Sequence, residues 1–220
     1  MTENSKQAVL TPAAAPHVTW PAHRWVSRHR GQLPSGIPAR DRPDVSPPIL
    51  GIRRRRAKDL GACARLLRVV YSQGQYPVYW PEAPRAWLSG QDVVTAWVLE
   101  RHGEIIGHVA ISRVGLDPVS ALRWRELTGQ PPSALAGVSR FFVRPRVRGQ
   151  GFGTALLDVA VANIRAAGLA PVFDVVSASK DAIKLHEDRG WQLRGTYPWG
   201  KPTDKLQISY YTSPPESDGY

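Results

Sequence analysis

The hydrophobic positions of this 220-residue chain become regular only from residue 49 onward, where they alternate between the spacings of helices and strands. Helical spacing is predicted after Asp59, at 85–88, after Gly153 and at 181–189. Strands are predicted at 49–53, 93–100, 104–114, 138–143, 171–177, 191–197 and 205–212. Residues 115–134 are expected to form an irregular insertion around a helical fragment at 119–127. This order of elements predicts a mixed α/β fold with an antiparallel front half.

Composition divides the chain into one domain and two tails. A hydrophobic content of 42% over 220 residues supports a single buried core. We predict a flexible, basic, proline-rich arm at residues 1–50, a domain at 51–213 and a short tail at 214–220. Residues 1–56 contain ten Lys/Arg and three Asp/Glu, so they carry +7 of the net charge of +11.

The composition of the arm is compatible with several binding partners. Trp20 and Trp25 lie there among basic residues, a mixture suited to docking on the domain, on RNA or on an acidic partner. Nucleic acid is not the favoured partner, because the rest of the chain carries only +4, but the arm does not exclude it. His17, His23 and His29 are spaced six apart, which no helix or strand places on one face, so no metal site is expected.

The sequence also disfavours a membrane-spanning protein and a disulfide-stabilised one. The apolar runs are too short to cross a bilayer, and the N-terminus lacks the apolar core of a signal peptide. Cys63 is the single cysteine, so neither a disulfide framework nor a cysteine metal set is available. We therefore expect a cytoplasmic protein without a membrane partner.

The segment 148–154, Arg-Gly-Gln-Gly-Phe-Gly-Thr, follows a short apolar run and precedes an amphipathic helical segment. Its alternating glycines let the backbone approach a ligand closely, and the helix N-terminus behind them adds a positive dipole. These features predict a site for a phosphate or pyrophosphate. A Walker loop is excluded because no Gly-Lys-Ser/Thr ending is present. The dinucleotide fingerprint fits poorly, since Thr154 stands at the third glycine position.

Two ordered motifs resemble those of the GCN5-related N-acetyltransferase (GNAT) superfamily. Arg148-x-x-Gly151-x-Gly153 is similar to the family's R/Q-x-x-G-x-G/A loop. Ser179-x-x-Ala182-x-x-x-His186-x-x-x-Gly190-Trp191 is similar to its N-x-x-A-x-x-x-Y-x-x-x-G-F/W segment. The likeness extends from about residue 52 to about residue 211. It implies a GNAT-like central mixed sheet of about six to seven strands flanked by helices, with acetyl-coenzyme A (acetyl-CoA) as co-substrate.

The resemblance also implies which residues bind acetyl-CoA. The pyrophosphate would lie against the N–H groups of 148–154, and the pantetheine arm would run beside the backbone of the preceding strand. Ser179 replaces the family's usual asparagine near the cofactor, although capping the next helix would be an equally good use of its hydroxyl. The predicted cofactor-binding residues are Phe142, Val143, Arg148, Gly149, Gln150, Gly151, Phe152, Gly153, Thr154 and Ser179.

Acetyl transfer to an amine needs a neutral amine, a stabilised oxyanion and a proton for the leaving thiolate. His186 stands where many family members have the tyrosine that donates this proton, so it is the candidate catalytic residue. A spectator ring packed beside the cofactor is the alternative. The strand before the loop lacks the glutamate that relatives often use as a base. The candidates elsewhere are Glu100, Glu104, Asp117, Glu126 and Asp174, with His108 acting through water.

Acceptor specificity is placed by the resemblance in two loops, 73–84 and 197–205. Tyr76, Tyr79 and Trp80 in the first are the predicted substrate-binding residues, and Trp199 and Asp204 lie in the second. Aromatic side chains would suit an apolar or a cationic amine, and packing within the loops is the alternative.

The predicted function is transfer of an acetyl group from acetyl-CoA to a primary amine of a small molecule or peptide. The family often forms dimers, so a homodimer stays open. The alternative function is a catalytically weak or inactive GNAT-fold module that binds acyl-CoA and engages RNA or a protein through the basic arm.

Overall fold

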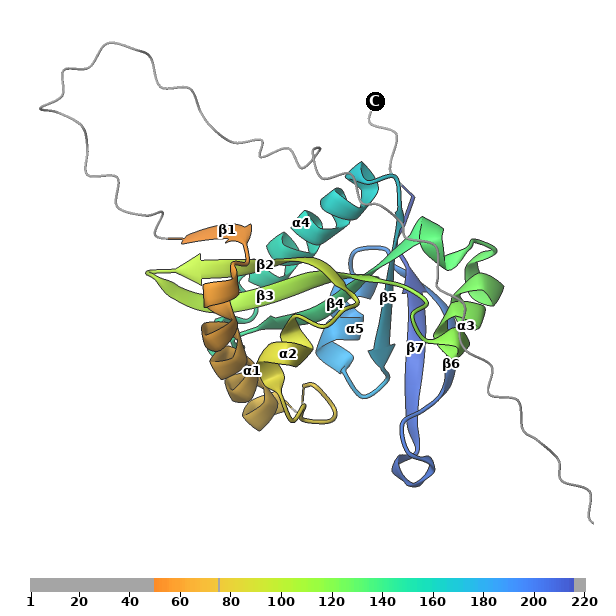
Figure 1. Ribbon diagram of the computed structural model, residues 1–220, viewed down its shortest axis with the longest axis horizontal. Coiled ribbons are helices and arrows are strands. Elements are labelled where there is room, and N and C mark those ends of the chain that lie inside the picture. The colour runs from red at the N-terminus through yellow and green to blue at the C-terminus, as the bar shows by residue number, and fades with distance from the viewer. Residues whose placement is uncertain (1–49, 75, 216–220) are drawn as a thin grey trace, which may run out of the picture.

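The computed structural model describes residues 50–74 and 76–215. The predicted arm therefore lies outside the described residues except at its last position, and so does most of the predicted C-terminal tail. Questions about the arm's partners and its three histidines lie outside them too. The described residues form one seven-stranded mixed sheet with helices on both faces, which confirms the predicted mixed α/β architecture (Figure 1).

The strands follow the order β1-β2-β3-β4-β5-β7-β6 across the sheet. Neighbours run antiparallel except β4 and β5, which are parallel. The predicted antiparallel front half is present, and the last two strands, β6 and β7, also pair with each other. The strands are β1 (Leu50–Arg54), β2 (Val93–Arg101), β3 (Glu104–Arg113), β4 (Leu135–Val143), β5 (Ala170–Val176), β6 (Gln192–Trp199) and β7 (Leu206–Thr212).

The helices lie at or near the segments where helical spacing was predicted. They are α1 (Leu60–Gly74), α2 (Pro84–Leu88), α3 (Pro118–Thr128), α4 (Phe152–Ala166) and α5 (Lys180–Glu187), with short 3-10 turns at Ala57–Asp59, Pro132–Ala134, Pro145–Val147 and Pro202–Asp204. The insertion is more regular than predicted, because Asp117 accepts a hydrogen bond from the Ser120 amide at 2.8 Å and so caps α3. Its Trp124 is buried at 1% exposure against Tyr210 of β7.

The helices divide the core between the two faces of the sheet. The face under α4 and α5 holds the largest cluster, in which Leu156 and Ile164 of α4 are fully buried. The opposite face carries α1 and α2, with Leu67 and Phe142 in its core, and α3 beyond them. Phe142 and Val143, which are consecutive in β4, therefore pack on opposite faces of the sheet, as strand geometry requires. This leaves β4 in the middle of the sheet with packed layers above and below it.

Candidate functional site

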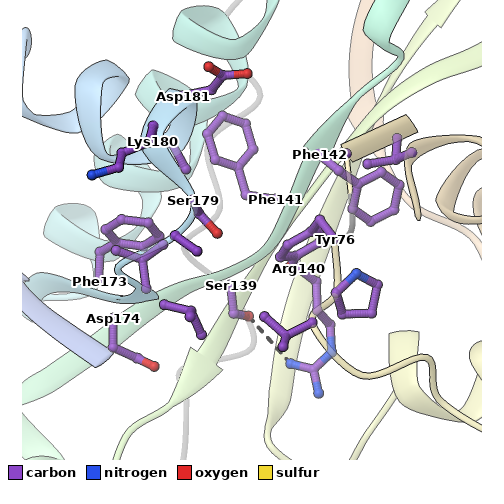
Figure 2. Close-up of a pocket in the computed structure, with 18 of the residues that line it drawn as sticks. Tyr76, Ser139, Arg140, Phe141, Phe142, Phe173, Asp174, Ser179, Lys180 and Asp181 are labelled. Atoms are coloured by element: carbon purple, nitrogen blue, oxygen red, sulfur yellow. Dashed lines mark hydrogen bonds between the residues drawn. The ribbon is translucent and has the colours of Figure 1, made fainter. Parts of the chain in front are cut away.

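The sheet opens into a wedge between its two parallel strands. Backbone pairing of β4 with β5 covers only Leu135–Ala170, Ala136–Pro171 and Gly137–Val172, and beyond these pairs the strands diverge. A cavity of about 660 Å³ fills the gap. Its walls are the residues of β4 and β5 past the last pair, the loop that follows α1 and the N-terminal turn of α5 (Figure 2).

A bulge in β4 shapes one wall of this pocket. The register with β3 shifts between His108–Phe142 and Ala110–Ser139, so β4 has one residue more than its partner there. Arg140 sits in this bulge with φ of 46°, a left-handed conformation unusual for a residue other than glycine. Backbone outliers of this kind gather at functional sites, where the surrounding contacts hold them in place.

The side chain of Arg140 holds the bulge. It donates to both carboxylate oxygens of Asp92, at 2.7 and 2.9 Å, and to the Trp87 carbonyl at 2.6 Å. A further bond reaches the Ser112 hydroxyl at 3.1 Å. Burial alone would raise the pKa of Asp92, but its hydrogen bonds and charge interaction with Arg140 lower it below the usual value. Sequence reasoning missed this cluster, because its members are far apart along the chain.

The glycine-rich loop forms an open cradle at the N-terminus of α4. Gly149 and Gly151 have φ values of 77° and 80°, which favour glycine, and a β-carbon built on either would meet no atom within 4 Å. The helix begins at Phe152, and its first bond to the loop runs from the Ala155 amide to the Gly151 carbonyl. The amides before Ala155 are therefore free to face a ligand, and the helix dipole favours an anion there.

Arg148 links this cradle to the pocket. Its guanidinium lines the cavity and donates to Asp181 in the first turn of α5 at 3.1 Å. The two side chains are 40% and 84% exposed, so the pair lies in solvent at the mouth and contributes little to stability. A phosphate bound at the loop would compete with Asp181 for the same guanidinium.

The structure brings together part of the predicted cofactor and substrate set. Phe142, Arg148, Ser179, Tyr76 and Tyr79 all line the cavity. The predicted capping bond from the Ser179 side chain is not made, although Ser179 is the N-cap residue of α5. Its hydroxyl is thus available to the pocket.

Two predicted residues lie elsewhere. Val143 is 7% exposed and packs in the core under α4, so only its backbone is available to a ligand. Trp80 lines a separate surface groove with Arg68, whose guanidinium lies 3.9 Å from the ring centroid. Tyr76 and Tyr79 of this loop line the cavity, whereas Trp80 packs against Tyr71 and the core under α1, which the composition of the loop did not indicate.

The two loops expected to select the acceptor meet over the pocket. Tyr79 stacks on Trp199 with ring centroids 5.5 Å apart. Its hydroxyl donates to Asp204, and this hydrogen bond is the main reason why the pKa of Asp204 lies below its usual value. Gly200 leaves room for this contact, because a β-carbon there would lie 2.6 Å from the Tyr79 hydroxyl oxygen. The loop after α1 is thereby joined to the β6–β7 hairpin.

His186 is enclosed in an aromatic core. It is fully buried and stacks on Phe173 with centroids 3.7 Å apart, while Trp191 meets it edge-on at 4.9 Å. Nδ1 donates to the Ala182 carbonyl at 2.8 Å, and Nε2 has no partner. Burial lowers the pKa of His186 to about 4, so the ring is neutral at physiological pH. Its role as the general acid stays a prediction, and this geometry favours the packing alternative.

Replacing His186 by phenylalanine should make the fold less sensitive to acid. The folded-state pKa lies below the unfolded value, so the unfolded state binds more protons between pH 6.5 and about 4, and stability is lost as pH falls through this range. Between about pH 7.5 and pH 5, the free energy of unfolding should therefore decrease by about 2 kcal/mol less in the variant than in the wild type. Urea denaturation at both pH values measures this. An unchanged loss would contradict burial of a neutral ring, and His102→Gln in the exposed β2–β3 turn is the control.

The other candidates for a general base are mostly engaged elsewhere. Glu100 pairs with Arg53, and Glu104 pairs with Arg144. His108 is buried, with Nε2 accepting from Arg55 at 2.9 Å and Nδ1 donating to a backbone carbonyl, and burial lowers its pKa to about 3. Asp174 lines the cavity, where desolvation raises its pKa to about 6.

Residues 50–74 and 76–215 contain no group of three or more His, Cys, Asp or Glu side chains placed to hold a metal ion. None of the helices in the same ranges combines the length and apolarity that a membrane span needs.

Comparison with known proteins identifies the family. The sequence model of the acetyltransferase (GNAT) family matches residues 62–191. An aminoglycoside 2'-N-acetyltransferase of Mycolicibacterium fortuitum is 31% identical over 118 residues, which are 53% of this chain and 51% of that protein. The chain thus spans about half the length of this relative.

Solved structures agree on the fold. An N-acetyltransferase from Staphylococcus aureus Mu50 superposes with a TM-score of 0.59 at 20% identity, covering 74% of this chain and 96% of that one. The yncA protein of Salmonella typhimurium, solved with its cofactor acetyl-CoA, gives 0.55 at 19% identity, covering 78% and 97%. Since the family model matches more than half of the chain and includes both motifs, this protein belongs to the acetyltransferase (GNAT) family of acyltransferases.

Proposed function

We propose that this protein transfers an acetyl group from acetyl-CoA to a primary amine of a small molecule or peptide. One observation carries the proposal: an anion cradle at the N-terminus of α4 continues, through Arg148, into a cavity bounded by a strand edge without a backbone partner. The name of the M. fortuitum relative, an aminoglycoside N-acetyltransferase, supports a small-molecule amine as the acceptor class.

The chain's residues fit acetyl-CoA in two places. The amides of 149–154 and the guanidinium of Arg148 would bind the pyrophosphate, since both present positive charge to one open space. The edge of β4 that faces the cavity is unpaired beyond Gly137, so the backbone around Phe142 offers hydrogen bonds to an extended amide-containing arm. Ser179 offers a hydroxyl on the opposite wall.

Bound acetyl-CoA would supply an acetyl group activated as a thioester. The protein's part is then to exclude water, hold the acceptor amine against that group and move its protons. Tyr76, Phe142 and Trp87 give the cavity an aromatic wall, with Tyr76 in ring contact with both others at 6.2 and 6.3 Å. Burial raises the pKa of Tyr76 above its usual range, so its hydroxyl keeps its proton.

A panel of primary amines, an aminoglycoside among them, tests this function through release of the coenzyme A thiol. We expect at least one amine to give saturable release that depends on both substrates. If no member is acetylated although acetyl-CoA binds, the proposed activity is contradicted and the inactive binding module is supported instead.

A further inference from the structure

Asp174 is a carboxylate inside the pocket for which the proposed function has so far no use. It lies two residues beyond Val172, the last residue of β5 that pairs with β4, and its side chain lines the cavity. It is exposed to the water of the cavity, yet enough protein surrounds it to raise its pKa to about 6. Among the described residues, no other side chain satisfies this carboxylate through a hydrogen bond or an ion pair, and only a hydrogen bond with its own backbone amide lowers its pKa. Desolvating a charge without a partner costs stability, so a ligand is its natural partner.

The position of Asp174 is the apex of the wedge. Ser139 lies two residues past the last paired residue of β4, just as Asp174 does on β5. Figure 2 shows Ser139 beside Arg140 and Asp174 across from them on the other strand. An extended arm that leaves the α4 cradle and runs back along β4 points toward this apex. The reactive end of such an arm would therefore arrive beside Asp174.

The side chain of Asp174 points to the face of the sheet on which the acceptor amine would bind. Strand alternation places Phe173 on the side of α4 and α5, where it packs with His186. Asp174 must then face the opposite side, which carries α1, α2 and the aromatic wall that includes Tyr76. The glycine cradle belongs to α4, so the donor and Asp174 approach the apex from opposite faces.

Asp174 is the carboxylate of the pocket that forms no ion pair with a described residue. Arg140 is paired with Asp92, and Arg148 is paired with Asp181. Several titratable and charged groups face Asp174 or share its cavity. They are Tyr76 and Tyr79 of the loop after α1, Arg140 of β4, Arg148 of the glycine loop, Tyr210 of β7, and Lys180 and Asp181 of α5. None of the described cations forms an ion pair with it.

We infer that Asp174 binds the ammonium group of the acceptor and takes a proton from its nitrogen during transfer. With one unpaired carboxylate and aromatic walls, the site selects an amine that carries a single positive charge next to an aromatic or apolar group. A polycation would leave further charges unpaired in the cavity. The inference rests on the proposed function and names the substrate class of the same site.

The proton balance of the step is complete. An ammonium acceptor first gives up one proton and becomes nucleophilic, and its lone pair then forms the C–N bond while the C–S bond of the thioester breaks. The attacking nitrogen loses a second proton to Asp174. One of the two protons converts the thiolate to the free thiol of coenzyme A, and the other leaves to water through the open mouth of the pocket.

Binding of phenethylamine and of its neutral analogue 2-phenylethanol separates this role from a structural one. Both affinities are measured in protein saturated with coenzyme A. We expect Asp174→Asn to lower the affinity for phenethylamine at least about 10-fold, as loss of a charge-assisted hydrogen bond does, and to leave the affinity for 2-phenylethanol unchanged. Asp188→Asn, which removes an exposed aspartate paired with Lys184 outside the pocket, is the matched control and should bind both as the wild type does. The Asn variant should fold, because Asp174 has no side-chain partner to lose.

Turnover gives an independent readout. For phenethylamine, kcat/KM of the wild type should rise with pH through about 6, because the base must be ionised, and this limb should be absent in Asp174→Asn. The inference would be overturned if the wild type bound phenethylamine and 2-phenylethanol equally, or if the wild type and Asp174→Asn bound phenethylamine equally. In either case, acetyl-CoA binding and acetylation of other amines would leave the proposed function standing. Preference for kanamycin over phenethylamine would overturn the single-charge selectivity. Failure of the wild type to bind acetyl-CoA would instead defeat the proposed function itself.

Discussion

Gly151→Asp should lower the affinity for acetyl-CoA by about 100-fold or more. The substitution places a carboxylate in the open space that the loop leaves above the N-terminus of α4. Two like charges about 5 Å apart repel by about 3 kcal/mol at an effective dielectric constant near 20, which corresponds to this loss. Isothermal titration of acetyl-CoA into the variant measures it.

Two variants separate charge from backbone strain in this experiment. Gly151→Asn has the same shape without the charge, and Asn and Asp tolerate a φ of 80° better than other side chains, so it should lose about 10-fold at most. Gly168→Asp creates the same strain at a φ of 75° at the far end of α4, about 22 Å away for a 15-residue helix, and should bind normally. Equal losses in Gly151→Asp and Gly151→Asn would contradict an anion cradle.

Arg140→Gly should lower the free energy of unfolding by about 2 to 3 kcal/mol. Glycine adopts the φ of 46° without strain, so the variant isolates the lost side-chain contacts. Removing one partner of a buried ion pair usually costs about 3 to 5 kcal/mol, and the Asp92 side chain is 31% exposed, so the smaller value applies. Urea denaturation followed by tryptophan fluorescence measures the change.

Lys184→Ala is the charge-matched control for Arg140. Lys184 pairs with Asp188 at 3.0 Å on the exposed face of α5, and such a pair contributes about 0.5 kcal/mol or less. A loss of less than about 1 kcal/mol for Arg140→Gly would show that the bulge holds its shape without this side chain. Arg140→Gly should also lower the affinity for acetyl-CoA in protein that is still folded, since the bulge forms the pocket wall.

The elements of this fold were predictable because their signals are local. Helical spacing after Asp59 and after Gly153 places α1 and α4 within two residues of their observed starts, and alternation places the strands. The glycines at 149 and 151 were predictive for a physical reason, since a positive φ beside a helix N-terminus requires them.

The features that the sequence did not reveal depend on contacts between distant residues. Arg140 and Asp92 are 48 positions apart, and Tyr79 and Asp204 are 125 apart, so no window of sequence contains either pair. The bulge at Arg140 has no residue signature, because arginine is an ordinary strand residue until its partners hold it at positive φ. Asp174 could be recognised as an unusual charge in an apolar strand, but its access to the cavity depends on how β4 and β5 diverge.

His186 illustrates how motif and environment differ. Its place in the second motif suggests proton donation, whereas its contacts with Phe173, Trp191 and the Ala182 carbonyl describe a neutral ring in the core. The carboxylate of Asp174 lies on the cavity side of the same strand as Phe173. The proton chemistry that we infer is therefore assigned to a different residue from the one that the motif indicated.

Titration of acetyl-CoA into the full chain shows whether the glycine loop and the pocket bind this cofactor. We expect saturable binding with one site per chain and a dissociation constant within about 1 μM to 1 mM, the range common for enzyme substrates. Absence of saturable heat up to about 10 mM acetyl-CoA, in protein shown to be folded by circular dichroism, would contradict this expectation.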